Sequence, residues 1–316
     1  MMVAFHTGTL GVRGSENALG DYAELNERIL GNRSVLVIPN RPGLEDNETF
    51  VRWRGRFPVL VYWNRPDLVQ KLHEYGVEVL YMIKPGYYDG LVVPGVRNCI
   101  HSMFLSDEFH GDRFAYVSPW AARVMTGKEE SFVPHLVVRF QSDTDLREEL
   151  GIPKNSRVFG RHGGADTFNI PFARKVVAEH ARNRPDDHFV FLNTQPISGT
   201  QGLANVHYLP ATVDPTKKAK FLATCDAMIH ARDTGETFGL AVAEFAVLGK
   251  RVFTFAGSRE KAHLEMLGSA GKMYQGPDDL RAAMEEFMPR QRFDSGYESF
   301  ADPKVVMQIF QRKFLH

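Results

Sequence analysis

One stretch of the sequence, residues 226–255, constrains the fold more than any other. It opens with the apolar run Ala227-Met228-Ile229 and closes with a second apolar run at residues 251–255, and each run is typical of a buried strand. Between them a loop leads into the helix-forming residues 240–248, and Gly249 ends that helix. Strand, helix and strand form a βαβ unit, in which both strands lie parallel in one sheet. We therefore expect an α/β fold with its ligand crevice at the carboxyl ends of the strands.

Two glutamates of this stretch, Glu236 and Glu244, stand eight positions apart. Gly235 and Gly239 indicate that Glu236 lies in the loop just before the first helical turn. The free N–H groups of that turn and the helix dipole favour a bound anion such as a phosphate. Both carboxylates are then free to accept hydrogen bonds from the hydroxyls of a sugar or a ribose. The simpler alternative, an amphipathic helix with a glutamate at each end, does not explain the glycines.

The rest of the chain repeats the alternation of strand and helix on both sides of a polar crossing that begins at residue 141. The expected strands are residues 2–5, 34–39, 59–63, 77–83, 96–101, 114–118, 157–161, 188–193 and 206–209. This alternation predicts two Rossmann-like domains. The first comprises residues 1–140 with a last helix at residues 303–316, and the second comprises residues 141–302.

A polar segment, residues 41–57, contains three arginines at alternate positions, Arg52, Arg54 and Arg56. In an extended chain these side chains share one face. That face could meet an anionic acceptor, but a solvated hairpin edge is the interpretation that we favour.

Composition narrows the classes of function. The 38 Lys+Arg and 38 Asp+Glu cancel, so the net charge does not indicate a nucleic-acid or anionic-membrane partner. Cys99 and Cys225 are too few for a disulfide framework or a cysteine-based metal site, and suit a reducing compartment. The N-terminus lacks the parts of a signal peptide, and no apolar run approaches the ~18 residues of a membrane span. We expect a soluble cytoplasmic protein, peripheral at a membrane only through its acceptor.

The run Glu236-Thr-Phe-Gly-Leu-Ala-Val-Ala-Glu244, followed by Gly249-Lys-Arg-Val, resembles the Glu-x7-Glu signature of retaining glycosyltransferases with the GT-B fold, in particular glycosyltransferase family 4. The likeness is strong at residues 226–255 and looser at residues 1–140. It implies two Rossmann-like domains that face each other across a cleft, with the last helix crossing back to the first. It also implies that a sugar moves, with retained configuration, from a nucleotide diphosphate sugar to a hydroxyl of a glycan, glycolipid or glycoprotein.

The resemblance implies roles for the central stretch. Glu244 accepts hydrogen bonds from the ribose, and Glu236, a catalytic residue, accepts them from the donor sugar. The diphosphate is held at the helix start, where the donor-binding positions are Thr237, Phe238, Gly239 and Leu240. The leaving phosphate deprotonates the acceptor, and no cofactor or metal is required.

The segment Gly160-Arg161-His162-Gly163-Gly164 resembles the Gly-Arg that opens onto the donor diphosphate in this family. Arg161 is therefore a predicted catalytic residue, which stabilises the departing diphosphate together with Gly163 and Gly164. The lysine that the family carries a few residues later is missing from residues 165–169.

Further positions are assigned more loosely. Gly14-Ser15-Glu16 resembles the Gly-Gly-x-Glu segment of the family, which makes Gly14 a donor-site residue. His101 matches a strand-ending histidine that reaches the donor sugar, and is the third predicted catalytic residue. Pro210 stands where the main chain of the family reads the nucleotide base. Tyr87 and Tyr88 follow an expected strand and are candidates to stack on a sugar acceptor, although simple packing explains them about as well.

Three alternatives remain. The missing lysine motivates a non-catalytic module that binds a nucleotide sugar or a glycan. A sugar-nucleotide epimerase or a phosphorylase on the same architecture is the second. A dinucleotide-dependent oxidoreductase is disfavoured, because no Gly-x-Gly-x-x-Gly turn follows a strand with an acidic residue at the usual distance. The sequence leaves the donor sugar, the base, the acceptor, the linkage and the oligomeric state open.

Overall fold

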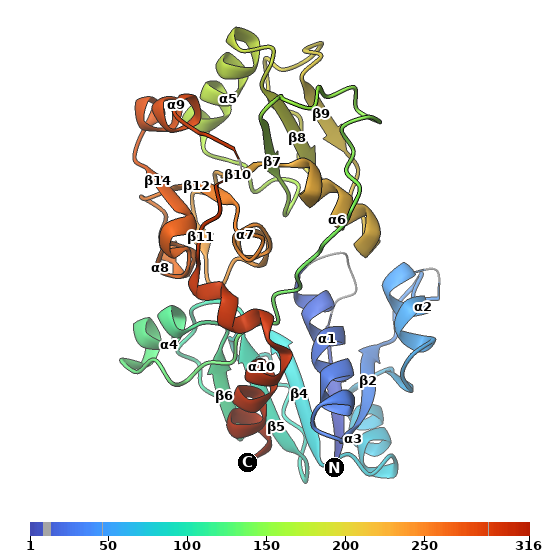
Figure 1. Cartoon of the computed structure of the whole chain (residues 1–316). Coiled ribbons are helices and arrows are strands. Elements are labelled where there is room, and N and C mark those ends of the chain that lie inside the picture. The colour runs from blue at the N-terminus through green and yellow to red at the C-terminus, as the bar shows by residue number, and fades with distance from the viewer. Residues whose placement is uncertain (9–13, 46, 290) are drawn as a thin grey trace. The chain divides into compact units, whose positions relative to one another are not determined.

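The computed structural model describes residues 1–8, 14–45, 47–289 and 291–316. The chain divides into two compact units (Figure 1), which are Met1–Leu136 with Asp302–His316 (unit 1) and Val137–Ala301 (unit 2). Each unit is built on one parallel sheet of six strands. The α/β class is confirmed, and the last helix belongs to unit 1, as expected.

The sheet of unit 1 has the strand order β3-β2-β1-β4-β5-β6. Its strands are β1 (Met2–His6), β2 (Arg33–Pro39), β3 (Val59–Tyr62), β4 (Val79–Lys84), β5 (Arg97–Ser102) and β6 (Arg113–Tyr116). Its helices are α1 (Gly14–Arg28), α2 (Glu48–Arg54), α3 (Arg65–Glu74), α4 (Pro119–Thr126) and α10 (Pro303–Phe310), with a π-helical turn at Gln311–Leu315. This is the doubly wound Rossmann order, in which the direction of winding reverses between β1 and β4.

Both faces of this sheet are buried, because side chains alternate between them. One face carries Ala4 and Met82 and packs on α3 through Leu68 and Leu72. The other carries Phe5 and Tyr81, which pack with Tyr22 of α1 and Phe310 of α10. The carbonyl groups of Phe314 and Leu315 accept hydrogen bonds from Cys99 and Arg97 of β5. The last helix is therefore part of the core of unit 1.

Residues 48–54 form helix α2, so the expected hairpin edge in this segment is wrong. The side chain of Asn47 accepts a hydrogen bond from Phe50 N, which caps the helix start. Phe50 and Trp53 are buried three positions apart on one helical face. The guanidinium of Arg56 binds Glu24 and Glu27, at 2.8 Å each.

Unit 2 has the strand order β14-β12-β10-β7-β8-β9. Its strands are β7 (Val158–Arg161), β8 (His188–Leu192), β9 (Val206–Leu209), β10 (Ala227–His230), β12 (Arg251–Phe255) and β14 (Gly271–Tyr274), with a small second sheet of β11 (Gly235–Glu236) and β13 (Glu260–Lys261). Its helices are α5 (Pro171–Asn183), α6 (Pro215–Thr224), α7 (Leu240–Ala246), α8 (Ala262–Met266) and α9 (Pro277–Glu285), with 3₁₀ turns at Gly268–Ala270 and Gly296–Ala301. Counted within the unit, this is the same Rossmann order, and the winding reverses between β7 and β10.

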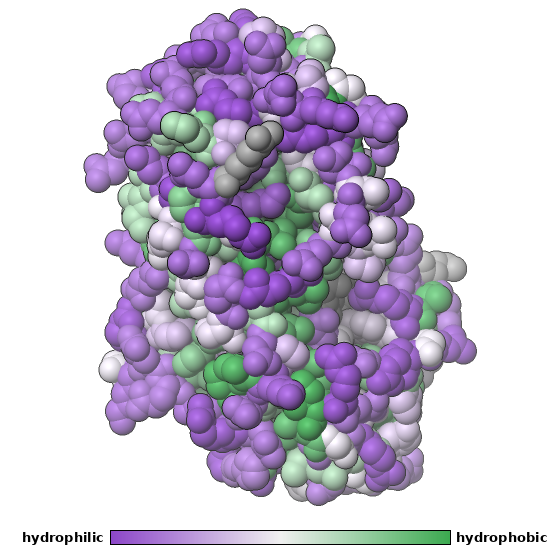
Figure 2. All heavy atoms as spheres, in the orientation of Figure 1, coloured by the Kyte–Doolittle hydropathy of each residue, from purple (hydrophilic) through white to green (hydrophobic). Residues whose placement is uncertain are grey.

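The core of unit 2 joins Phe159, Phe189 and Phe253 of the sheet to buried side chains of α5 and α9. On the face shown in Figure 2, hydrophilic residues cover most of the surface and hydrophobic residues gather in small patches. No helix in the described part of the chain is long and apolar enough to cross a membrane.

Candidate functional site

Apart from Gly14 and Pro210, the residues predicted to bind the donor lie near the point where the winding of the second sheet reverses. β7 ends at Arg161 and the neighbouring β10 ends at His230, and the loop after β10 leads to Glu236. In open α/β sheets, ligands bind outside the carboxyl ends of the strands at this point. The fold of unit 2 thus brings Arg161 and the central stretch to one edge.

Gly235 fixes the backbone before Glu236. It pairs with Glu260 in the two-stranded ladder of β11 and β13, and its φ of +75° is in the left-handed region. A Cβ at this position would lie 2.0 Å from the main-chain oxygen of Glu260. Only glycine fits there, and the ladder that it permits holds Glu236 ahead of α7.

Glu236 is held as a carboxylate by two donors. Arg232 Nη1 donates to Oε2 at 2.8 Å, and His230 Nε2 lies 3.2 Å from Oε1. Burial alone would raise the pKa of Glu236, but the His230 hydrogen bond and the nearby cationic groups lower it to about 2. Its side chain retains partial exposure, at 20%. Glu236 is therefore an acceptor of hydrogen bonds and stays ionised at neutral pH.

A buried hydrogen-bond chain continues behind Glu236. Thr254 Oγ1 lies 3.0 Å from His230 Nδ1 and 3.1 Å from His263 Nε2. A carboxylate only accepts, so His230 Nε2 carries a proton, and in neutral His230 the Nδ1 atom must accept from the Thr254 hydroxyl. Thr254 Oγ1 can then accept from His263 Nε2. Burial lowers the pKa of His263 to about 3, although a main-chain contact to Glu236 acts in the opposite direction. The chain thus fixes the His230 tautomer that serves Glu236.

Glu244 is a buried residue of α7, and its carboxylate faces Lys218 and His162 from other parts of unit 2. Lys218 of α6 donates to its Oε1 at 2.5 Å. His162 Nε2 lies 3.0 Å from Oε2, outside the usual angles of a hydrogen bond, and still helps to lower the pKa of the carboxylate. Burial raises the pKa of Glu244, and the charge of Lys218 outweighs it, so the pKa is lowered overall. Oε2 is therefore a buried carboxylate oxygen with one poorly aligned neighbour, and it has lone pairs left for a ligand hydroxyl.

Arg161 is buried, and its two terminal nitrogens bind protein groups. Nη1 donates to Thr194 Oγ1 and the Asn193 carbonyl, and Nη2 donates to Thr167 Oγ1 and the Gly164 carbonyl, at 2.6 to 3.1 Å. Burial lowers the pKa of Arg161 to about 10, so it remains charged at neutral pH. Arg161 thus organises the 163–167 loop, and any action on a ligand from these nitrogens comes through its charge.

The turn Gly163-Gly164 follows directly. Asn193 Nδ2 donates to the Gly163 carbonyl at 2.8 Å, and Arg161 Nη2 donates to the Gly164 carbonyl at 2.7 Å. With both carbonyls turned to these donors, the N–H groups of Gly163 and Gly164 find no acceptor among the described residues. A pair of free main-chain donors beside a buried arginine can bind an anion.

The start of α7 also presents main-chain N–H groups that no side chain caps. Gly239 caps the helix without a side-chain hydrogen bond, so the first-turn N–H groups, beginning at Leu240, have no side-chain acceptor there. Thr237 and Phe238 are buried, and the Phe238 carbonyl accepts a hydrogen bond from Tyr297. α7 has only seven residues, so local N–H groups rather than a long helix dipole would meet an anion.

Pro210 follows β9, the edge strand of the second sheet, and is exposed. It offers a carbonyl at the carboxyl edge of the sheet, which suits a main-chain contact to a base.

The predicted residues of unit 1 are placed differently. His101 is fully buried, and its ring nitrogens bind Tyr81 OH at 2.6 Å and the Val133 carbonyl at 2.8 Å. Both nitrogens are occupied, so the arrangement argues against the predicted contact with a donor sugar and gives His101 a structural role. Gly14 is the first residue of α1, and the loop before it, residues 9–13, lies outside the described residues. Tyr87 and Tyr88 are 57% and 54% exposed.

Several residues of the site were not predicted, notably His162, Lys218, His230 and Arg232. Arg232 and His230 stand four and six positions before Glu236, so a search for cationic partners near the predicted carboxylate would have found them. Lys218 is 26 residues from Glu244, and its contact depends on the packing of α6 beside α7.

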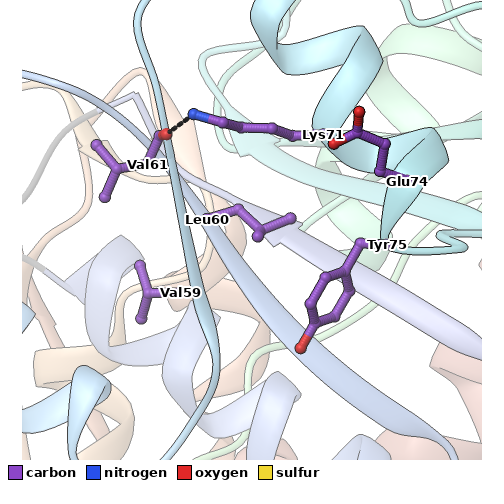
Figure 3. Close-up of a pocket in the computed structure, with 6 residues that line it drawn as sticks. All are labelled: Val59, Leu60, Val61, Lys71, Glu74 and Tyr75. Carbon is purple, nitrogen blue, oxygen red and sulfur yellow. Dashed lines mark hydrogen bonds between the residues drawn. The ribbon is translucent and has the colours of Figure 1, made fainter.

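A hollow of about 340 Å³ lies elsewhere, on unit 1 beside β3 and α3, and Figure 3 shows the residues that line it. Lys71 crosses it to donate to the Val61 carbonyl at 2.6 Å, and no predicted site residue lines it. Within the described ranges, no three His, Cys, Asp or Glu side chains are grouped to hold a metal ion.

Comparisons with known proteins identify the fold. A scan against models of protein families finds no match, and a search of curated proteins finds no similar sequence. Solved structures do match. HepE from Anabaena in complex with UDP has a TM-score of 0.67 and 16% identity, over 99% of this chain and 96% of HepE. The HepE complex with UDP-glucose matches with a TM-score of 0.65 and 14% identity, over 99% of this chain and 95% of HepE.

Two further matches widen the range of activities on this architecture. WaaG, a glycosyltransferase involved in lipopolysaccharide biosynthesis, has a TM-score of 0.64 and 12% identity over 98% of this chain and 99% of WaaG. A protein thought to be a UDP-N-acetylglucosamine 2-epimerase from Listeria monocytogenes has a TM-score of 0.59 and 11% identity over 98% of this chain and 94% of its own. The chain thus has the fold of GT-B glycosyltransferases, with two Rossmann-like units.

Proposed function

We propose that the protein is a retaining glycosyltransferase, similar to those of family 4, which moves a sugar from a nucleotide diphosphate sugar to an acceptor hydroxyl. The observation that carries the proposal is the buried Glu244 carboxylate at the switch point of unit 2, whose Oε2 has only the poorly aligned His162 ring beside it among the described residues. The fold supports it, because proteins of this fold have been crystallised with UDP and UDP-glucose.

In this proposal the two acids bind neutral hydroxyls. The ribose donates to Glu244, which keeps Lys218 as its counter-ion. A donor-sugar hydroxyl donates to Glu236, whose partial exposure leaves lone pairs for a ligand. With a pKa of about 2, Glu236 cannot take a proton at neutral pH, so the proton of the acceptor hydroxyl goes to the leaving phosphate.

The diphosphate is stabilised by main-chain donors and by the charge of Arg161. The N–H groups of Gly163, Gly164 and the residues around Gly239 approach its oxygens, and Arg161 holds the first of these turns in place. Negative charge that grows on the leaving group is then met without a metal. We expect turnover to continue in the presence of a chelator.

The test uses a panel of nucleotide sugars with UDP, GDP and TDP as the nucleotide. Binding is measured by calorimetry, and slow release of nucleoside diphosphate is measured in the same samples. Glu244→Gln should weaken binding of UDP about tenfold or more, because a charged acceptor of hydrogen bonds is lost. The matched control is Glu285→Gln on α9, which changes an exposed glutamate of the same unit. Equal UDP affinity in the two variants would contradict the role of Glu244.

A second candidate is a nucleotide-sugar-binding module without catalysis. It is favoured by the terminal nitrogens of Arg161, which are occupied by protein acceptors, and by the lysine missing from residues 165–169. Binding of a nucleotide sugar without release of the diphosphate, with any acceptor tried, would favour the module. Products formed without an acceptor would instead indicate an epimerase.

A further inference from the structure

The first sheet also has a switch point, and polar side chains gather there. β1 ends at His6 and its neighbour β4 ends at Lys84, on the two sides of the reversal, while β3 ends at Tyr62. By the alternation of side chains, all three continue the apolar face that packs on α3, through Ala4, Leu60 and Met82. The apolar face of the sheet therefore becomes polar at its carboxyl edge, where ligands bind in such folds.

These side chains interact with one another. His6 Nε2 lies 2.8 Å from Tyr62 OH, and Lys84 Nζ donates to Asp89 Oδ1 at 2.6 Å. Asp89 and Lys84 act electrostatically on His6, and Asp89 and Arg41 act on Tyr62, so the groups form one cluster. Burial lowers the pKa of His6 to about 4, so the imidazole is neutral.

This cluster has more buried hydrogen-bond donors than acceptors. Lys84 is 8% exposed and has three N–H bonds, but Asp89 is its one hydrogen-bond partner among the described residues. Arg41 Nε is buried without a hydrogen-bond partner among those residues, and Arg41 Nη2 donates to the Gly8 carbonyl. Lys84 pairs with Asp89, which is half-exposed, and Arg41 acts electrostatically on Tyr62. A buried ammonium and a buried guanidinium N–H need acceptors, so an oxygen-rich anion would complete the cluster.

From this juxtaposition we infer that the carboxyl edge of β1, β3 and β4 binds an oxyanion, a phosphate or a carboxylate, through Lys84 and Arg41 with the His6–Tyr62 pair beside it. If the proposed transferase activity holds, on which this step rests, the anion belongs to the acceptor, which is then a phosphorylated or acidic saccharide. Tyr87 and Tyr88 adjoin Asp89 in the chain and offer exposed rings for the sugar.

The test needs no donor and no turnover, so it is separate from the proposed function. The full-length protein is titrated by calorimetry with glucose 6-phosphate, glucuronate, inorganic phosphate and glucose. We expect the anionic probes to bind and neutral glucose to bind at least tenfold more weakly. Preference for glucose 6-phosphate over glucuronate identifies a phosphate, and the reverse identifies a carboxylate.

Two substitutions at the ion pair should act in opposite directions. Lys84→Met removes the buried ammonium and should weaken binding of the better anionic probe about tenfold or more. Asp89→Asn removes the negative charge that competes with the ligand, and should tighten binding several-fold. Lys71→Met is the matched control, because Lys71 also pairs with an aspartate on the same unit, Asp67.

A purely structural ion pair predicts a different pattern. Both Lys84→Met and Asp89→Asn would then lower the melting temperature, and neither would change anion binding relative to Lys71→Met. That result, or equal binding of glucose and the anionic probes, would overturn the inference.

Discussion

The two switch points of this molecule share a strand order and differ in their electrostatics. In unit 2 the carboxylates of Glu236 and Glu244 face Arg232, His230 and Lys218, and the buried atom without a well-aligned donor is an oxygen of Glu244. In unit 1 the buried atoms left over are donors, on Lys84 and Arg41. The first site suits a ligand rich in hydroxyls, and the second suits an anion. The same parallel scaffold thus presents opposite hydrogen-bonding demands at two edges.

The largest effect on ligand binding is expected from a glycine-to-alanine substitution at the carboxyl edge of either sheet. Gly235→Ala places a Cβ 2.0 Å from the Glu260 oxygen, and Gly86→Ala places one 2.0 Å from Ser102 Oγ, both at positive φ. Gly235→Ala should abolish UDP binding while leaving binding of glucose 6-phosphate to unit 1, and Gly86→Ala should do the reverse. Calorimetry with both ligands on both variants tests this.

Gly202→Ala controls for backbone strain. Gly202 has φ +78°, close to that of Gly235, but a Cβ there meets nothing within 4 Å. We expect a loss of about 1 to 2 kcal/mol in unfolding free energy and no change in either affinity. Loss of both ligands in both clashing variants would mean that the two edges are not independent.

Much of the fold could be predicted because it depends on local patterns. The apolar runs at residues 227–229 and 251–255 became β10 and β12, since their length and composition suit a buried strand in any context. Helix α2 was not predicted, because arginines at alternate positions suit an extended segment. Asn47, a capping residue, and Phe50 and Trp53 on one helical face are the signals that favour the helix.

The candidate site could be predicted only in part, because its partners come from distant segments. Glu236 and Glu244 are marked by local glycines, but the Lys218 contact is set by the packing of two helices. His101 was assigned to the donor sugar by the resemblance alone. A strand-ending histidine is by itself more often structural, and here Tyr81 and Val133 occupy both of its nitrogens in the core.

A smaller effect than the glycine pair is expected for Lys218→Met. The buried Glu244 then loses its counter-ion, which should raise its pKa, and UDP affinity should fall about tenfold at neutral pH. In the double variant with Glu244→Gln the losses should not add, because both changes break one pair. Additive losses in the calorimetric cycle would mean that Lys218 acts on the ligand by itself.

Thr254→Val should have an intermediate effect confined to unit 2. Valine keeps the shape and removes the hydroxyl that fixes the His230 tautomer, so the orientation of Glu236 loosens. We expect catalytic turnover of the donor to fall several-fold with little change in UDP affinity, because UDP lacks the donor sugar. Long-range ¹H–¹⁵N NMR of the histidine rings should report a mixed tautomer for His230, and an unchanged tautomer would contradict this role.

The last effect concerns the pH dependence of stability, through His6, and is small at neutral pH. Its folded pKa of about 4 lies below the unfolded value of 6.5, so the unfolded state binds more protons between these values. Unfolding free energy should therefore fall as the pH drops below 6.5, by about 1.4 kcal/mol per pH unit for this residue. His6→Gln should make the slope of melting temperature against pH shallower. Saturating glucose 6-phosphate should do the same in the unsubstituted protein, because an anion beside the ring favours its charged form. A slope of melting temperature against pH that responds to His6→Gln and not to glucose 6-phosphate would mean that the anion binds away from His6. The carboxyl edges of the two sheets would then differ less in the ligands they bind than their hydrogen bonds suggest.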